Sequence, residues 1–115
     1  MECLFCKIAS GERSSETEYE DAEIKAFRDI RPSAPVHILI IPKEHIESIA
    51  RLEAEHNEII AKLIYRAKQI AVDKGLAGYK LVFNVGREGG QVIDHLHLHL
   101  LGGWGQRDNP DNYRV

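Results

Sequence analysis

Cysteine, long apolar runs and surplus positive charge are all scarce in this sequence of 115 residues. There are only two cysteines, and no apolar run approaches the roughly 20 residues that a helix needs to cross a bilayer. The net charge is −3, whereas a domain that binds duplex nucleic acid normally carries a basic patch. The first residues also lack the basic and apolar regions of a secretory signal. We therefore expect a cytoplasmic protein that binds neither membranes nor nucleic acid and needs no disulfide framework.

The residues that are present predict one compact domain over 1–115. Hydrophobic residues make up 43% and charged residues 29%, which is typical of a chain that folds. Apolar spacing predicts a short helix over 3–10, ended by Gly11, and a long helix over 52–74. Alternating or β-branched runs predict four strands, at 24–28, 36–41, 79–85 and 92–101. This order of elements indicates an α+β fold with a mostly antiparallel sheet.

The last predicted strand carries the most unusual pattern, because His95, His97 and His99 alternate with leucines. Successive side chains of a strand leave opposite faces, so the three imidazoles should share one face at separations of roughly 6.5–7 Å. Packing gains nothing from three histidines in register, which favours a chemical role. Such a row can bind a transition metal, or one histidine can attack phosphorus while its neighbours orient it and manage protons.

The residues before the histidines favour the phosphorus chemistry. Gly89, Gly90 and Gln91 form a backbone that can approach a ligand and offer N–H groups and a side-chain amide. Asn84 ends the preceding predicted strand and can add another amide donor. Phosphate oxygens need such donors, whereas a metal ion does not.

The segment from Gln91 to Leu101 resembles the signature of the histidine-triad (HIT) family, His-φ-His-φ-His-φ-φ, where φ is apolar. Further motifs follow the Hint branch of that family in order, and the resemblance covers about 3–103, leaving a tail at 104–115. These motifs are Phe5-Cys6-Lys7-Ile8, Phe27-Arg28-Asp29-Ile30, Ala34-Pro35-Val36-His37, Ile41-Pro42-Lys43-Glu44-His45-Ile46, Asn84-Val85-Gly86 and Gly89-Gly90-Gln91.

The resemblance implies a homodimer with purine nucleoside phosphoramidase or related nucleotide hydrolase activity, releasing AMP or GMP. His97 would be the nucleophile, His99 would bond the phosphoryl oxygen and move a proton, and the carbonyl of His95 would orient His97. No metal would be needed for this step. The implied nucleotide-binding residues are Phe5, Ile8, Phe27, Asp29, Ile30, Asn84, Gly90, Gln91 and Val92.

Two positions depart from the family's pattern. Relatives commonly carry Ser or Thr where this chain has Val92, so a hydroxyl near the leaving group is missing. Arg31 stands where small polar residues are familiar, and it either tunes the ribose edge or projects into solvent. The tail, with Trp104, Tyr113 and Arg114, either lies across a partner's active site or is an ordinary surface segment.

The spacing Cys3-x-x-Cys6 is that of metal ligands, although two plain thiols would have the same spacing. His45 and His95 are the candidates to complete a tetrahedral site, and similar bacterial proteins place a structural zinc on these four positions. Zinc there would tie the amino-terminal helix to the sheet. His37 and His56 are interpreted as a strand residue and a helix-surface residue without a chemical role.

Two alternatives to a HIT-type hydrolase remain. One is a purine-nucleotide-binding or regulatory protein with little turnover, which Val92 supports. The other is a metalloenzyme that uses His95, His97 and His99 together as ligands.

Overall fold

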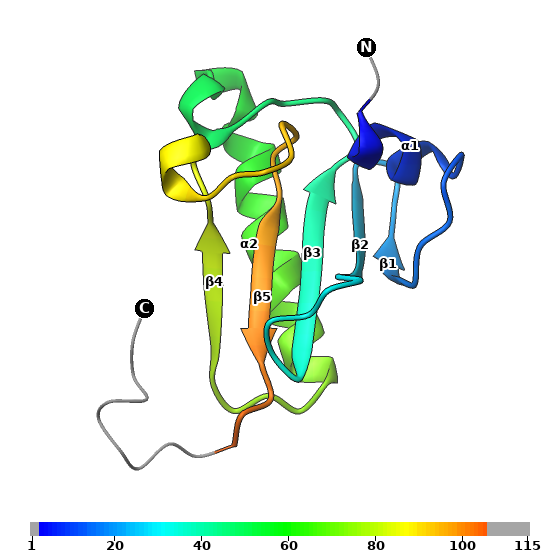
Figure 1. Ribbon diagram of the computed structural model, residues 1–115, viewed down its shortest axis with the longest axis vertical. Coiled ribbons are helices and arrows are strands. Elements are labelled where there is room, and N and C mark those ends of the chain that lie inside the picture. Colours follow the sequence, from blue (N-terminus) through cyan, green and yellow to red (C-terminus); the bar gives the residue numbers. More distant parts are fainter. Residues whose placement is uncertain (1–2, 106–115) are drawn as a thin grey trace.

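In the computed structural model, which describes residues 3–105, one antiparallel sheet carries a long helix on one face and a short helix at one end (Figure 1). This confirms the predicted α+β class. The helices and strands are α1 (Leu4–Ser10), β1 (Thr17–Glu20), β2 (Ile24–Arg28), β3 (Val36–Pro42), α2 (Asn57–Asp73), β4 (Tyr79–Phe83) and β5 (Leu98–Gly102). Single 3-10 turns occupy Ile49–Arg51, Ala54–His56 and Arg87–Gly89.

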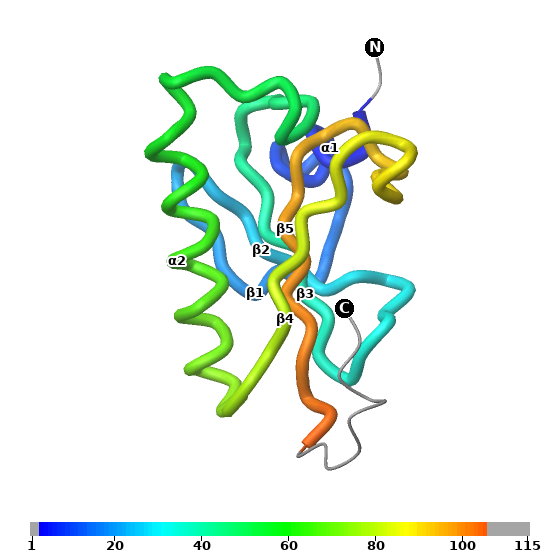
Figure 2. Tube along the Cα trace, turned by 90° about the vertical axis from the view of Figure 1, so that its left-hand side faces the viewer, coloured from blue at the N-terminus to red at the C-terminus, as the bar shows by residue number. Residues whose placement is uncertain are grey.

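The five strands lie in the order β1-β2-β3-β5-β4, so the two central strands are β3 and β5. Figure 2 shows α2 covering one face of the sheet, with α1 at the far side near one end. The larger hydrophobic cluster joins α2 to that face, and it includes Leu63 and Ala67 from the helix and Leu98 and Leu100 from β5. A smaller cluster packs Phe5 and other α1 residues against β2 and β3 on the opposite face. His99 of β5, which pairs with Leu39 of this smaller cluster, therefore lies on the α1 side of the sheet.

Strand register defines a straight row of residues across this second face. His99 is opposite Leu39, Leu39 is opposite Phe27, and Phe27 is opposite Thr17. Directly opposite residues of paired strands point to the same face, and neighbouring strands lie about 4.8 Å apart. The row therefore runs about 14 Å from the histidine strand to the outer strand β1.

The helix ends follow local chemistry. Cys3 is the N-cap of α1, and its sulfur accepts a hydrogen bond from the backbone N–H of Cys6. Gly11 has φ 84° and ends this helix in the left-handed conformation, as its position in the sequence predicts. The long helix begins at Asn57 rather than at 52, because Glu53 and His56 form a reciprocal capping box around a separate 3-10 turn. His56 is therefore a capping residue and not a member of the helix surface.

The histidine strand is shorter than predicted, because β5 begins at Leu98 rather than at 92. Its neighbour β3 ends at Pro42, which has no N–H group for the ladder. Leu96 instead donates its N–H to the carbonyl of Ile46, at 2.7 Å. His95 and His97 consequently lie in the segment that leads into the strand, and only His99 belongs to the ladder.

The sequence analysis also missed β1, whose residues are mostly exposed and therefore show no clear apolar alternation. Its pairing with β2 places the preceding segment, 13–15, at the outer edge of the α1-side face.

Tyr113 and Arg114 lie outside the described residues. Within residues 3–105, no helix is long and apolar enough to cross a membrane.

Candidate active site

A cavity of about 590 Å³ opens on the α1 side of the sheet. One end is lined by His97, His99, Asn84, Gly90 and Val92, and the other end reaches the segment 13–15. The apolar walls between these ends are Leu4, Phe5, Ile8, Phe27, Ile30, Leu39 and Ile93. Asp29 lies on the cavity wall between the apolar part and the histidines' hydrogen-bond network. The cavity therefore combines a polar catalytic end with an apolar slot.

His97 is held in one orientation and one tautomer. Its Nδ1 lies 2.7 Å from the backbone carbonyl of His95, and a carbonyl only accepts, so Nδ1 carries the hydrogen. The ring packs edge-on against Phe5 with ring centroids 5.1 Å apart. Nε2 is then the nitrogen with a free lone pair. A buried imidazole with an unprotonated, oriented nitrogen is a nucleophile or a base.

His37 fixes His99 in the tautomer opposite to that of His97. The N–H of Ser33 donates to His37 Nδ1 at 2.9 Å, so the hydrogen of neutral His37 is on Nε2. That Nε2 lies 2.9 Å from His99 Nδ1, which must accept. The remaining hydrogen of His99 is therefore on Nε2, where it can be donated. The rings of His97 and His99 are 4.9 Å apart, closer than the separation expected from the strand repeat.

The surroundings keep all three of these imidazoles neutral. Burial lowers the pKa of His99 to about 4 and also lowers the pKa of His37 and of His97. Asp29 opposes this trend, and its Oδ2 lies 3.5 Å from His37 Nε2. The hydrogen-bond chain therefore keeps its direction across the neutral pH range, with a lone pair on His97 and a donor on His99.

His37 is the residue that the sequence analysis missed. Its ring is buried and its place in β3 gives no chemical signal, since it is a lone histidine in an apolar strand. Only the pairing of His37 with Leu101 of β5 brings it beside His99. The one sequence signal was its motif Ala34-Pro35-Val36-His37, which the resemblance singled out.

The resemblance implies hydrolysis of a nucleoside phosphoramidate. For that substrate, replacement of His37 by alanine should lower kcat by about 10- to 100-fold with little change in KM, because His99 would lose the partner that fixes its tautomer. The His37→Gln variant can donate from its amide nitrogen to His99 and should recover part of this loss. Steady-state kinetics of the wild type and both variants check this prediction. Equal kcat values for the alanine and glutamine variants would contradict it.

The glycine turn differs from the prediction that its backbone N–H groups face a phosphate. The N–H groups of Gly86, Gly89, Gly90 and Gln91 are all bonded within the turn. Gln91 is buried, and its side-chain amide donates to the carbonyls of Glu47 and Ile93. Gln91 therefore holds the turn in place and does not line the cavity. Asn84 does line it, and its Nδ2 donates to the carbonyl of Gly89 at 2.9 Å.

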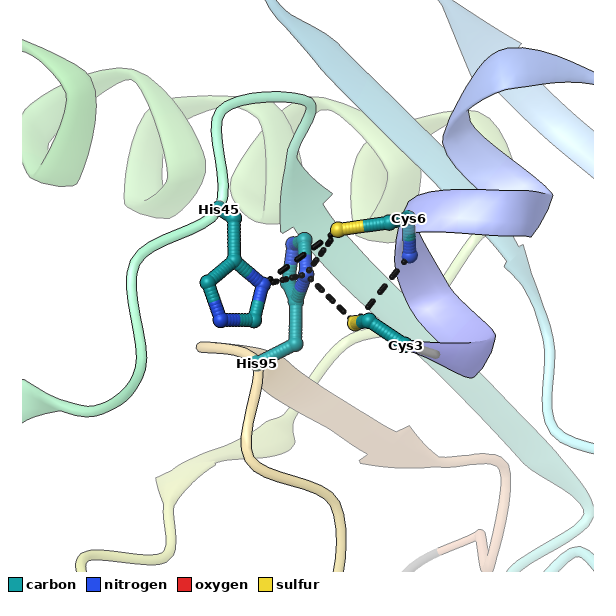
Figure 3. A group of neighbouring side chains, drawn as sticks. All are labelled: Cys3, Cys6, His45 and His95. Atoms are coloured by element: carbon teal, nitrogen blue, oxygen red, sulfur yellow. Dashed lines mark hydrogen bonds between the residues drawn. The ribbon is translucent and has the colours of Figure 1, made fainter. Parts of the chain in front are cut away.

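His95 points away from the cavity toward Cys3, Cys6 and His45 (Figure 3). Its Nε2 donates to the carbonyl of Pro42 at 2.8 Å, so its Nδ1 carries a lone pair. That Nδ1 lies 3.3 Å from Cys3 Sγ, 3.5 Å from Cys6 Sγ and 3.2 Å from His45 Nδ1. Burial raises the pKa of the Cys6 thiol to about 11. The four side chains thus form a Cys2His2 cluster that could bind a metal.

The donor set and its spacing fit zinc. Zinc bonds of about 2.0–2.1 Å to nitrogen and 2.3 Å to sulfur in a tetrahedron place the ligand atoms about 3.3–3.8 Å apart, with nitrogen–nitrogen pairs closest and sulfur–sulfur pairs farthest. The separations of 3.2–3.5 Å between the nitrogens and sulfurs of the cluster lie within about 0.3 Å of these values. Because His95 faces this cluster, the three histidines of the row do not share a ligand centre among the described residues. Asp29, His37 and His99 form a second group of ligand type within the active site.

The fold and this site define a small α+β protein with a paired-histidine pocket and a neighbouring Cys2His2 cluster. A family model described as "Scavenger mRNA decapping enzyme C-term binding" matches residues 2–107. The chain is 45% identical over 104 residues to the purine nucleoside phosphoramidase of Escherichia coli K12, covering 89% of this chain and 87% of that protein. It is 48% identical over 103 residues to the 14 kDa zinc-binding protein of Zea mays, covering 87% and 80%.

A solved structure agrees with these sequence relatives. The HIT family hydrolase from Legionella pneumophila Philadelphia 1 superposes with a TM-score of 0.89 and 51% identity, covering 95% of this chain and 99% of that one. The chain belongs to the histidine-triad (HIT) family. This confirms the family that the histidine motif indicated.

Proposed function

We propose that this protein hydrolyses purine nucleoside 5′-phosphoramidates, or related adenylylated compounds, through a nucleotidyl-histidine intermediate. The observation that carries the proposal is the complementary pair at one end of the cavity. Hydrogen bonds leave a lone pair on His97 Nε2 and a hydrogen on His99 Nε2, and the two rings lie 4.9 Å apart. Nucleotidyl transfer to a histidine needs one nitrogen that attacks and one N–H that protonates the leaving group.

The proposed reaction has two steps. In the first, His97 Nε2 attacks the α-phosphorus, the phosphorus–nitrogen bond to the leaving amine breaks, and the Nε2 hydrogen of His99 passes to that amine while a solvent proton replaces it, so that His99 stays neutral. The carbonyl of His95 stabilises the positive charge that develops on His97 through Nδ1. In the second step, water attacks phosphorus, its proton passes through His99 to solvent, and the nucleoside monophosphate leaves with His97 regenerated.

The remaining walls of the cavity suit a nucleoside. Phe5 and Phe27 pack edge-on at 5.5 Å and, with Ile8 and Ile30, provide apolar surface for a purine. The Asp29 carboxylate can accept two hydrogen bonds from the vicinal ribose hydroxyls. Asn84 donates one Nδ2 hydrogen to the carbonyl of Gly89, so its second Nδ2 hydrogen is available to a phosphate oxygen. This placement puts phosphate, sugar and base in order along the cavity.

Zinc is proposed as a structural ion held by Cys3, Cys6, His45 and His95, supported by the fit of the donor spacing. The ion would cross-link α1 to the segment that follows β3 and to the segment that precedes β5. The chemistry at phosphorus does not require it, because the reacting nitrogens belong to His97 and His99.

A homodimer is proposed as well. Strand β4 is a sheet edge with Leu81 exposed on it, and Val72 of α2 is 59% exposed.

The hydrolase is tested by intact-protein mass spectrometry after incubation with adenosine 5′-phosphoramidate and an acid-free quench. Wild type or His99→Ala should gain the mass of one adenylyl group, and His97→Ala should not. The His99→Ala variant removes the group that takes a proton from the attacking water, so its adduct should be hydrolysed slowly and persist through the quench. The Asp29→Ala variant is a matched control, since it should weaken binding without removing the nucleophile.

A binding or regulatory protein is the second candidate, and Val92 is the observation that favours it. This side chain is 79% exposed at the catalytic end of the cavity, where it offers a leaving group no hydrogen bond. Absence of both adduct and AMP, with nucleotide binding intact, would overturn the hydrolase and support this second candidate.

A further inference from the structure

We infer that Arg13 makes this cavity select guanine and other 6-oxopurine nucleotides over adenine nucleotides. The inference rests on the proposed function, in which the cavity holds a purine nucleotide with its phosphate at His97. It concerns the far end of the cavity, which the proposed chemistry does not use.

The strand register determines which part of a nucleotide reaches Arg13. His99, Leu39 and Phe27 of the row line the cavity, and the row continues beyond them to Thr17, the first residue of β1. A nucleotide with its phosphate at the histidines and its ribose at Asp29 lies with its base over the apolar part of this row. The polar edge of the base then faces the outer strand, which the segment Arg13–Ser15 directly precedes.

The position of this segment is fixed by hydrogen bonds at both ends. The N–H of Arg13 donates to the carbonyl of Lys7 in α1 at 3.0 Å, and Ser15 Oγ lies 3.3 Å from Thr17 Oγ1. Arg13, Ser14 and Ser15 all line the cavity. The backbone therefore holds the Arg13 side chain at the cavity's outer end.

Among the described residues, Arg13 differs from Arg28 in having no ion-pair partner, and from Arg31 in its place on the cavity wall. Arg28 is paired with Glu16 at 3.3 Å, and Arg31 follows the Asp29 turn, in which its N–H donates to Asp29 Oδ1. Within residues 3–105, the guanidinium of Arg13 has no hydrogen-bond or ion-pair partner. Its donors are available to a ligand in the slot.

The chemistry of the purine edge supplies the selection. A guanidinium donates hydrogen bonds and accepts none. Guanine presents two acceptors side by side, O6 and N7, and arginine bonds both at once. Adenine presents N7 beside the N6 amino group, which is itself a donor and faces the guanidinium without a bond. Hypoxanthine shares O6 and N7 with guanine but lacks the N2 amino group, so it separates recognition of this edge from recognition of N2.

The test is titration calorimetry of the full chain with GMP, IMP and AMP. Wild type should bind GMP and IMP about tenfold more tightly than AMP. In Arg13→Ala the three affinities should agree within about twofold, and Arg13→Lys, with a single point of donation, should give an intermediate preference. Arg31→Ala is the matched control, because it removes the other unpaired arginine of the same wall and should keep the GMP preference.

Each result distinguishes this inference from the proposed function. Equal affinities for AMP and GMP in wild type, or a GMP preference that survives Arg13→Ala, would overturn the role of Arg13. A preference for GMP that IMP does not share would overturn it too, because the N2 group would then be the feature recognised. A preference that depends on Arg13, in a protein that forms no adduct and releases no nucleotide, would support the inference and refute the hydrolase.

Discussion

Replacement of His97 by alanine is expected to lower kcat for adenosine 5′-phosphoramidate by at least about 10⁴-fold while leaving AMP affinity within about threefold. The side chain supplies an imidazole lone pair at the catalytic end of the cavity, because its Nδ1 is bonded to the carbonyl of His95 and its Nε2 is left free. Asp29 and the apolar slot, which would hold the nucleoside, do not depend on it. Steady-state kinetics combined with calorimetric binding of AMP measures both effects on the same preparation.

The glycine variant at this position gives a sharper version of the test. His97→Gly would leave a space beside Phe5, whose ring lies 5.1 Å from that of His97, and added imidazole can occupy it. Imidazole should restore part of the activity of His97→Gly and none of that of a variant also lacking His99. A His97→Ala protein with near-normal kcat would exclude His97 as the nucleophile. Loss of AMP binding in step with kcat would instead indicate a structural role.

Loss of one of the proposed zinc ligands is expected to produce the largest effect on stability. Cys3→Ala should abolish stoichiometric zinc binding and lower Tm by about 10–20 °C, since metal-binding free energy is folding free energy for such sites. The cluster joins the start of α1 to the segments after β3 and before β5. Without the ion, α1 is attached to the sheet by its smaller hydrophobic cluster and by the hydrogen bond from Lys25 Nζ to the carbonyl of Ile8 at 2.8 Å. Thermal unfolding followed by circular dichroism, with metal content measured by mass spectrometry, checks both parts.

Chelation provides the control for this prediction. A strong chelator should lower the Tm of wild type toward that of Cys3→Ala and should leave the variant unchanged. Zinc binding should weaken as pH falls, because the thiols must lose their protons to bind the ion, and burial raises the pKa of Cys6. Ser10→Ala, at the exposed end of the same helix, should retain zinc. A wild type that carries no zinc after purification with zinc present would refute the site.

Much of the site was predictable because its residues carry their signals locally. The alternation of His95, His97 and His99 with leucines indicates a chemical role for these histidines, and the family motifs reach from Phe5 to Gln91. The cavity brings together eight of the expected nucleotide-binding residues, Phe5, Ile8, Phe27, Asp29, Ile30, Asn84, Gly90 and Val92. Their individual roles remain proposals.

Other features were not predictable, because they depend on contacts between distant segments. Gln91 carries the amide that a phosphate would need, yet tertiary packing directs that amide to Glu47 and buries it. His37 has no periodicity that distinguishes it from a packed strand residue, and only strand pairing places it 2.9 Å from His99. The outer strand β1 was missed because an exposed edge strand needs no apolar alternation.

The sequence by itself determined the fold class, the family and the residue types of both sites. Apolar periodicity, helix-capping residues and metal-ligand spacing are patterns within a few consecutive residues, so they can be recognised without the tertiary structure. Tertiary structure alone decided how the histidines divide their work. His95 turns to the cysteines because its Nε2 bonds Pro42, while His97 and His99 face the cavity in opposite tautomers. The position of the hydrogen on an imidazole is set by the partner of its other nitrogen. Those partners are Pro42 and His37 of β3 and the backbone carbonyl of His95, just before β5.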